Sequence, residues 1–191
     1  LGYVSFREVN AQFVNIYNRV NTIELRNYSQ SNDVKTNGIS GVGGLIGNID
    51  GSSTVNMHSI VSQINRIKGM PTQDCLSINS KGSCYTGGVI GGIINGHIRI
   101  TDLLSSVNIL EGDYTGGCIG TIDEYLYMLS FIQNASFQNH LIVTDRAAAG
   151  IVGLYENIQN YQQKLSLQNV SVFSNFALND STIFSSVIGL Y

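Results

Sequence analysis

Residues 87–120 read GGVIGGIINGHIRITDLLSSVNILEGDYTGGCIG, a segment that opens and closes with two glycines, two apolar residues and a third glycine. The five-residue pattern recurs along the chain, and its last two copies have lost the double glycine: 43–47, 87–91, 116–120, 149–153 and 185–189. Leu1-Gly2-Tyr3 resembles the end of a further copy. Self-similarity at a period of about 20–50 residues is typical of repeat architectures.

The closing glycine of each copy marks the repeat: Gly2, Gly47, Gly91, Gly120, Gly153 and Gly189. We take residues 1–191 as one repetitive segment, divided at these glycines into units 2–46, 47–90, 91–119, 120–152 and 153–188. The chain begins and ends at the same phase of the repeat, so we expect it to be an excerpt of a longer array.

Each unit contains apolar residues in alternation, which is the pattern of a strand with one buried face. The pairs are Val14-x-Ile16, Val55-x-Met57, Ile98-x-Ile100, Leu129-x-Phe131 and Leu165-x-Leu167. A small polar residue follows each pair, and we predict that these residues stack as a polar column at a turn: Asn18, Ser59, Asp102, Asn134 and Asn169. A third apolar stretch closes each unit.

Three short strands in each unit predict an all-β fold, a right-handed parallel β-helix (β-solenoid) of about five irregular coils. A single coil leaves its strand edges and its apolar face uncovered, and stacking on the next coil covers both. The predicted handedness follows from the general right-handedness of parallel crossovers. The repeat glycines fit places where neighbouring backbones approach closely or bend.

The composition excludes several classes of protein. The chain has 191 residues with 10 basic and 13 acidic side chains, and charged residues are only 12% of it. Its 43% hydrophobic content excludes a disordered chain, and its few scattered cations exclude nucleic-acid binding through phosphates. The longest apolar runs, such as residues 89–94, are too short to form a transmembrane segment, which needs about 20 residues.

The segment 87–120 resembles the GLUG repeat, which has a Gly-Gly-apolar-apolar-Gly core, a short glycine-containing gap, an apolar strand, a serine and a second strand. The third unit fits this pattern well, and the first two units carry inserted loops. GLUG repeats occur in large secreted or surface-attached proteins, including adhesins. The resemblance implies a β-helical segment outside the cell or at its surface, and it implies no catalytic residue.

The three cysteines suggest no metal site. Cys75 and Cys84 could close a disulfide in the longest loop, as an oxidising compartment permits, or they could remain two thiols. Cys118 replaces an apolar residue of a repeat motif, so we expect it to be a small buried hydrophobic residue. No Cys–His spacing suits zinc, and we predict neither a metal nor a cofactor.

The residue types that carry catalysis are scattered. His58, His97 and His140 lie in different units, so we interpret them as surface histidines rather than as bases beside a nucleophile. Asp123-Glu124 is an adjacent acidic pair, and neighbouring strand residues point to opposite faces, so these carboxylates cannot share one cleft unless they lie in a turn. We therefore predict no catalytic residues and no enzyme.

Two kinds of side chain are candidates for contact with sugars. Acceptor sequences for N-glycosylation begin at Asn27, Asn134, Asn169 and Asn179. A glycan on Asn134 or Asn169 would clash with the predicted polar column, so Asn27 and Asn179 are the candidate sites. Four tyrosines could form an aromatic strip for sugars or pack against neighbouring coils: Tyr125, Tyr127, Tyr155 and Tyr161.

These observations favour a non-catalytic structural or adhesive repeat segment, a stalk or an adhesin, outside the cell or at its surface. Its partner would be a protein or a glycan at a surface, or a second copy bound through the solenoid ends. Two alternatives stay open. One is a protomer of a surface filament whose coil ends pair between subunits, and the other is an accessory spacer of a secreted protease or polysaccharide-active enzyme.

Overall fold

The computed structural model describes residues 3–5, 10–25, 40–50, 53–70, 84–125, 130–155, 165–178 and 182–190. Over these residues the protein is all-β, and each described strand pair is parallel. This confirms the predicted class of fold, parallel sheets of the kind that a solenoid contains. Among the described residues, none belongs to a helix with the length and hydropathy needed to traverse a bilayer.

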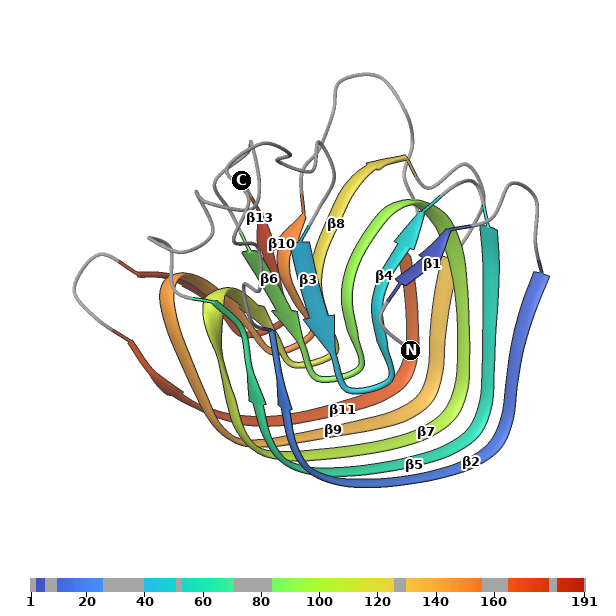
Figure 1. Ribbon diagram of the computed structural model, residues 1–191, viewed down its shortest axis with the longest axis horizontal. Coiled ribbons are helices and arrows are strands. Elements are labelled where there is room, and N and C mark those ends of the chain that lie inside the picture. The colour runs from blue at the N-terminus through green and yellow to red at the C-terminus, as the bar shows by residue number, and fades with distance from the viewer. Residues whose placement is uncertain are drawn as a thin grey trace, which may run out of the picture.

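The strands occupy three positions that recur along the chain (Figure 1). The first position holds β1 (Tyr3–Ser5), β4 (Ile46–Asp50), the start of β7 (Ile90–Gly116), β8 (Ile119–Tyr125), β10 (Val152–Tyr155) and β13 (Ile188–Leu190). The second, long position holds β2 (Asn10–Glu24), β5 (Ser53–Lys68), the middle of β7, most of β9 (Ser130–Ala149) and β11 (Leu165–Ala177). The third holds β3 (Ser40–Gly43), β6 (Cys84–Gly87), the ends of β7 and β9, and β12 (Ile183–Ser185).

One set of the three positions is called a layer below. Layer 1 contains β1–β3, layer 2 contains β4–β6, layer 3 is β7, layer 4 contains β8 and β9, and layer 5 contains β10–β12. The long strands pair in the order β2, β5, β7, β9, β11 and appear as nested U-shaped ribbons in Figure 1. Strand β13 pairs with β10 beyond layer 5. Parallel neighbours therefore come from successive repeats.

The repeat motifs lie side by side in this arrangement. Ile46, Ile90, Ile119, Val152 and Ile188 are aligned across the first position, so the closing glycine after each of them is aligned too. Gly91 shows why this place takes glycine, because a Cβ there would lie 2.3 Å from the Gly47 carbonyl oxygen and 2.5 Å from the Val42 nitrogen. Backbone fills the space that a side chain would need. Gly2 lies outside the described residues.

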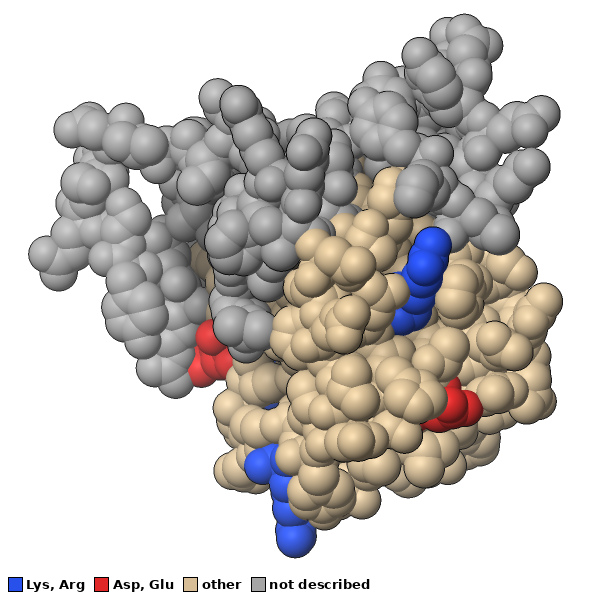
Figure 2. All heavy atoms as spheres, turned by 90° about the vertical axis from the view of Figure 1, so that its right-hand side faces the viewer, with Lys and Arg blue, Asp and Glu red and all other residues tan. Residues whose placement is uncertain are grey.

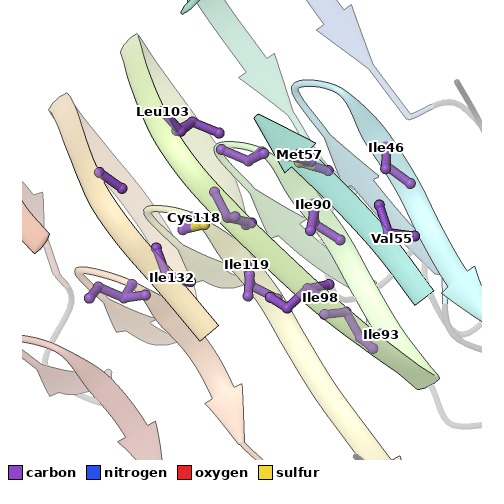
Figure 3. Close-up of a cluster of buried hydrophobic side chains, with 14 of the residues drawn as sticks. Ile46, Val55, Met57, Ile90, Ile93, Ile98, Leu103, Cys118, Ile119 and Ile132 are labelled. Carbon is purple, nitrogen blue, oxygen red and sulfur yellow. The ribbon is translucent and has the colours of Figure 1, made fainter. Parts of the chain in front are cut away.

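The layers enclose a core of aliphatic side chains. Ile46, Ile90 and Ile119 come from first-position strands and are fully buried. They pack with inward side chains of the long strands, such as Val55 and Ile98, as Figure 3 shows. Burying an aliphatic side chain of this size contributes about 1.5–3 kcal/mol. Each layer adds side chains at equivalent places, so the core is built from aligned columns.

Each long strand contains one residue with left-handed backbone: Asn15, Ser59, Asp102, Asn134 and Asn169, with φ between 50° and 55°. Strand pairing skips this residue in every layer. Asn and Asp tolerate this conformation better than other residues with a side chain, which explains the residue type in four of the five strands; Ser59 is the exception. The predicted column is wrong in the first unit, because Asn15 and not Asn18 occupies the left-handed place.

The predicted alternation also slips in the first unit. Ala11 and Phe13 pair with the buried residues Val55 and Met57, so Val14-x-Ile16 is not the equivalent pair. The left-handed residue explains the error. It separates Val14, which is 49% exposed, from Ile16, which packs against the core, so the pair spans a bend rather than one face of a strand.

A slip of one residue affects the fourth unit. Ile132 pairs with Ile100 and is fully buried, whereas Phe131 pairs with Arg99 on the outer face. The Arg99 guanidinium carbon lies 6.0 Å from the centre of the Phe131 ring, within the range of a cation–π contact. Phe131 is therefore wrong as an inward residue, because a shift of one residue reverses the face. Leu129, the other residue of the predicted pair, lies outside the described residues.

Candidate functional site

The outer face of the long strands carries two rows of polar side chains that run from layer to layer. The amide row begins with Asn21, Asn65 and Asn108. Asn65 Nδ2 donates a hydrogen bond to Asn21 Oδ1 at 3.2 Å, and Asn108 Nδ2 donates to Asn65 Oδ1 at 3.0 Å. In each case the later layer donates to the earlier one, so the row has a direction. The repeat motifs alone do not predict this row.

The left-handed residues form the second row. Asn134 Nδ2 donates to Asp102 Oδ1 at 3.1 Å, and Asn169 Nδ2 donates to Asn134 Oδ1 at 3.0 Å. The direction is again from the later layer to the earlier one. Asn18, which lies outside this row, donates to the Gly44 carbonyl oxygen at 3.2 Å and to Ser62 Oγ at 3.3 Å.

A shallow groove runs between the two rows across layers 1 to 4. Its lining is neutral for most of its length and includes Tyr17, Val61, Gln63, Leu104 and Ser106. Tyr17 donates a hydrogen bond to Gln63 Oε1 at 3.1 Å. The groove offers hydroxyl, amide and apolar surface to solvent, and it holds no cluster of acids or bases.

His58 and Asp102 form a contact that resembles part of a catalytic triad. His58 Nδ1 lies 3.3 Å from Asp102 Oδ2 and 2.9 Å from Thr101 Oγ1. A triad needs the carboxylate on one ring nitrogen and the nucleophile on the other, and here both oxygens meet the same nitrogen. Both side chains are about half exposed. The arrangement therefore serves as a surface contact between layers 2 and 3.

The other two histidines differ in environment. His97 is only 6% exposed, so the interpretation of all three as surface residues is wrong for this one. Its place explains the burial, because it pairs with Thr54 beside the core position of Ile98. His140 is exposed on β9, where its carbonyl oxygen accepts a hydrogen bond from Asn175 Nδ2 at 3.0 Å.

Two partly exposed ion pairs join neighbouring long strands. The Arg66 guanidinium contacts the Glu111 carboxylate, with Nε at 3.1 Å from Oε2, and links layers 2 and 3. Lys68 Nζ lies 3.7 Å from Glu24 Oε1 and links layers 1 and 2. These side chains are partly exposed, so each pair contributes about 1 kcal/mol or less. Figure 2 shows only a few scattered charged side chains on the face that it presents.

One carboxylate is fully buried. Asp113 lies 3.2 Å from Arg146 Nε, and Arg146 also donates a hydrogen bond to the Tyr114 hydroxyl at 3.3 Å. The hydrogen bond to Tyr114 raises the pKa of Arg146, burial lowers it, and the charge of Asp113 raises it further. The guanidinium carbon also lies 5.6 Å from the centre of the Tyr114 ring. Arg146 thus links layers 3 and 4 and compensates the buried charge.

The cysteines have different states. Cys118 is a fully buried free thiol, as predicted, and burial raises its pKa far above the ordinary value. Cys84 is buried and belongs to a disulfide. Cys75 lies outside the described residues, so its predicted pairing stays a prediction.

Several other predicted residues lie outside the described part of the chain. Asn27, Asn179, Tyr127 and Tyr161 are among them, and no side chain of Asp123, Glu124 or Tyr125 is described. Tyr155 is half-buried, and burial raises the pKa of its hydroxyl. Within the described residues, no group of three or more His, Cys, Asp or Glu side chains is arranged to hold a metal ion.

Comparison with protein-family models, with curated proteins and with solved structures finds no match to this chain. The resemblance to the GLUG repeat therefore stays a prediction. The described polar side chains connect successive layers in rows and pairs. Chemically, this arrangement ties the layers together and presents a neutral outer surface of amides and hydroxyls.

Proposed function

We infer that this chain is a non-catalytic structural or adhesive segment, and that its layers are the coils of a right-handed parallel β-helix. One observation carries the inference: its described amide rows and ion pairs join side chains of successive layers instead of meeting at one point. Contacts of this kind stiffen a stack of repeats. Stiffness suits a stalk that presents a surface to a protein or a glycan.

A place outside the cell or at its surface is part of this proposal. The Cys84 disulfide supports it, because disulfides persist mainly in oxidising compartments. The low charge and the neutral groove on the outer face suit contact with a neutral surface rather than with nucleic acid.

The test is antibody labelling of cells that make the protein. An antibody raised against residues 1–191 should label intact cells, or should recognise the protein in their medium. A signal that appears only after the cells are permeabilised would contradict the proposed location. Incubation of the purified chain with intact cells and with their isolated surface glycans would then separate an adhesive role from a purely structural one.

A further inference from the structure

The groove between the two polar rows contains an apolar strip, which consists of Tyr17, Val61 and Leu104. These residues pair in register across β2, β5 and β7. Leu104 is 56% exposed although β7 has a neighbouring layer on both sides, so its exposure does not come from an end of the stack. Within layers 2 to 4, it is the one large hydrophobic side chain among the described residues that is exposed. Apolar side chains that lie together in a polar groove are typical of a binding surface.

Polar side chains lie beside this strip at the same spacing. The next outward row, which pairs in register across four strands, holds Arg19, Gln63, Ser106 and Gln138. The amide row of Asn21, Asn65 and Asn108 lies beyond it. The central part of the groove has a volume of about 160 Å³ and is lined by residues of layers 2 to 4. The groove therefore combines apolar and neutral polar surface in a pattern that repeats from strand to strand.

The amides of the groove have hydrogen-bonding capacity left for a ligand. Asn65 Nδ2 uses one of its two hydrogens toward Asn21, and Asn65 Oδ1 accepts one bond, from Asn108, although it has two lone pairs. Gln63 Oε1 accepts from the Tyr17 hydroxyl, and Gln63 Nε2 donates to no described residue. Both side chains are exposed. The contacts between layers therefore orient these amides, while donors and acceptors remain available on the same side chains.

The charge of the groove limits the class of ligand. Among the described residues that line it, the charged ones are Arg19 in layer 1 and Asp102 in layer 3, which have opposite signs. A polyanion needs several cations along its path, and a polycation needs several carboxylates. The described lining offers neither, so a neutral ligand that forms hydrogen bonds through hydroxyl groups fits it.

We propose that this groove binds a neutral, unbranched glycan chain that crosses the strands. This inference rests on the proposed adhesive function and names the chemical class of its partner. A pyranose ring has an apolar C–H face and polar hydroxyl edges. The C–H face would pack on the apolar strip, and the hydroxyls would bond to Gln63, Ser106 and the amide row. Neighbouring strands lie about 4.8 Å apart, and a pyranose unit advances an extended glycan by a similar distance, so one ring fits over each strand.

An extended peptide fits the same surface less well. Its side chains repeat on one face at about 6.8 Å, which is out of step with strands that lie about 4.8 Å apart. Strands β5, β7 and β9 also pair on both sides, so their backbone is not available for a peptide strand to pair with. The geometry of the groove therefore favours a glycan over a polypeptide.

The experiment is isothermal titration of the 191-residue chain with oligosaccharides of known length. The neutral probes are hexasaccharides of β-1,4-linked glucose, N-acetylglucosamine and mannose, and hexagalacturonate is the anionic comparison. At least one neutral probe should bind, with equal affinity in low and high salt, and hexagalacturonate should not bind. For shorter and longer chains of the sugar that binds, affinity should rise up to about four units and then stay constant, because the groove crosses four strands.

Two truncations test whether the sugar lies in this groove. Leu104→Ala removes apolar surface and Gln63→Ala removes an amide, and each should raise the dissociation constant about three- to tenfold. Val14→Ala and Gln168→Ala are the matched controls, because they truncate exposed side chains of the long strands that do not line the groove. The controls should bind like the wild type. Circular dichroism and thermal unfolding establish that each variant is folded.

The inference fails if a folded wild-type chain binds none of the neutral probes at millimolar concentration, or binds only hexagalacturonate. It also fails if the groove variants bind the sugar as tightly as the controls do. A peptide ligand, in place of a glycan, whose binding is weakened by Leu104→Ala and Gln63→Ala would assign the groove to a protein partner and overturn the inference. None of these results concerns the location of the protein, which antibody labelling tests, so the proposed structural function can stand without this ligand.

Discussion

Layers 1 and 2 carry isoleucine at two equivalent places of their long strands and bury it differently. Ile60 and Ile67 of layer 2 are at most 1% exposed, whereas Ile16 and Ile23, their partners in layer 1, are half-buried. The side chains and their register are the same, and only the number of neighbouring layers differs. Burial in this protein is therefore supplied by the stack and not by the sequence of a single repeat.

The largest expected effect comes from truncating the same side chain in both layers. Ile67→Ala should lower the free energy of unfolding by about 3–4 kcal/mol, because it leaves a cavity that neighbours on both sides cannot fill. Ile23→Ala should cost about 1–2 kcal/mol, because water already reaches that side chain. Urea unfolding of the two variants at a concentration where the chain is monomeric measures the difference.

Equal losses for the two variants would contradict the comparison. The matched pair Ile60→Ala and Ile16→Ala provides an independent control at a second place in the same strands. If the loss of unfolding free energy in layer 2 exceeds that in layer 1 by the same factor for both pairs, the difference belongs to the layer and not to the particular side chain.

A methyl group at Gly91 tests how closely the inner layers approach. Gly91→Ala should destabilise the protein by about 3 kcal/mol, because its Cβ would lie within 2.6 Å of backbone atoms of Gly47, Val42 and Gly41. Ala149→Gly is the control, since it changes a repeat motif where a methyl is already accommodated, and it should cost about 1 kcal/mol. A loss below about 1 kcal/mol for Gly91→Ala would mean that the backbones are not packed in this way.

Cys118 and Val187 occupy equivalent places, linked by hydrogen bonds through Ile151. Cys118 is fully buried in layer 4, and Val187 is 41% exposed at the end of the stack. Val187→Cys should therefore react with a maleimide at a rate that rises as pH approaches about 8.5, the ordinary thiol pKa. Cys118 should not react until the protein unfolds. Mass spectrometry of the labelled peptides distinguishes the two thiols.

The raised pKa of Cys118 also predicts a dependence of stability on pH. The folded protein keeps the thiol proton at a pH where the unfolded chain loses it, so the unfolded state binds fewer protons. The contribution of the protonated Cys118 thiol to the free energy of unfolding is fully present below about pH 8.5. Above that pH it declines, by up to about 1.4 kcal/mol per pH unit. Cys118→Val should remove this part of the decline, and an unchanged profile in that variant would contradict the assignment.

The smallest effect is expected for the ion pairs between layers. Glu111→Gln should cost about 0.5–1 kcal/mol and Glu24→Gln about 0–0.5 kcal/mol, because the first pair lies between layers 2 and 3 and the second at the end of the stack. Both costs should shrink in 1 M salt. A larger loss of unfolding free energy for Glu24→Gln than for Glu111→Gln would contradict the difference between the end layer and the interior layers.

The sequence predicts the class of fold because the motif repeats and because alternation is a direct signature of strands. The parallel sheets and the burial of Cys118 follow from those two features. Which residues of a strand face inward was harder to predict. A single left-handed residue resets the alternation, so Asn18 took the place that belongs to Asn15 in the predicted column.

Contacts between repeats could be found only once the register was known. His58 meets Asp102, and the amide row forms from Asn21, Asn65 and Asn108, because the parallel register places these residues at neighbouring positions of adjacent strands. A signal was present, since the asparagines are separated by 44 and 43 residues, as are the paired strands around them. The repeat glycines alone do not show which outward side chains meet.

Amide hydrogen exchange on the monomeric chain shows whether neighbouring layers stabilise each repeat from both sides. Amides of β7 should exchange slowest, close to the rate set by global unfolding, and amides of β2 and β11 should exchange much faster through local opening. Uniform protection across the five long strands, or slower exchange in β2 and β11 than in β7, would contradict it.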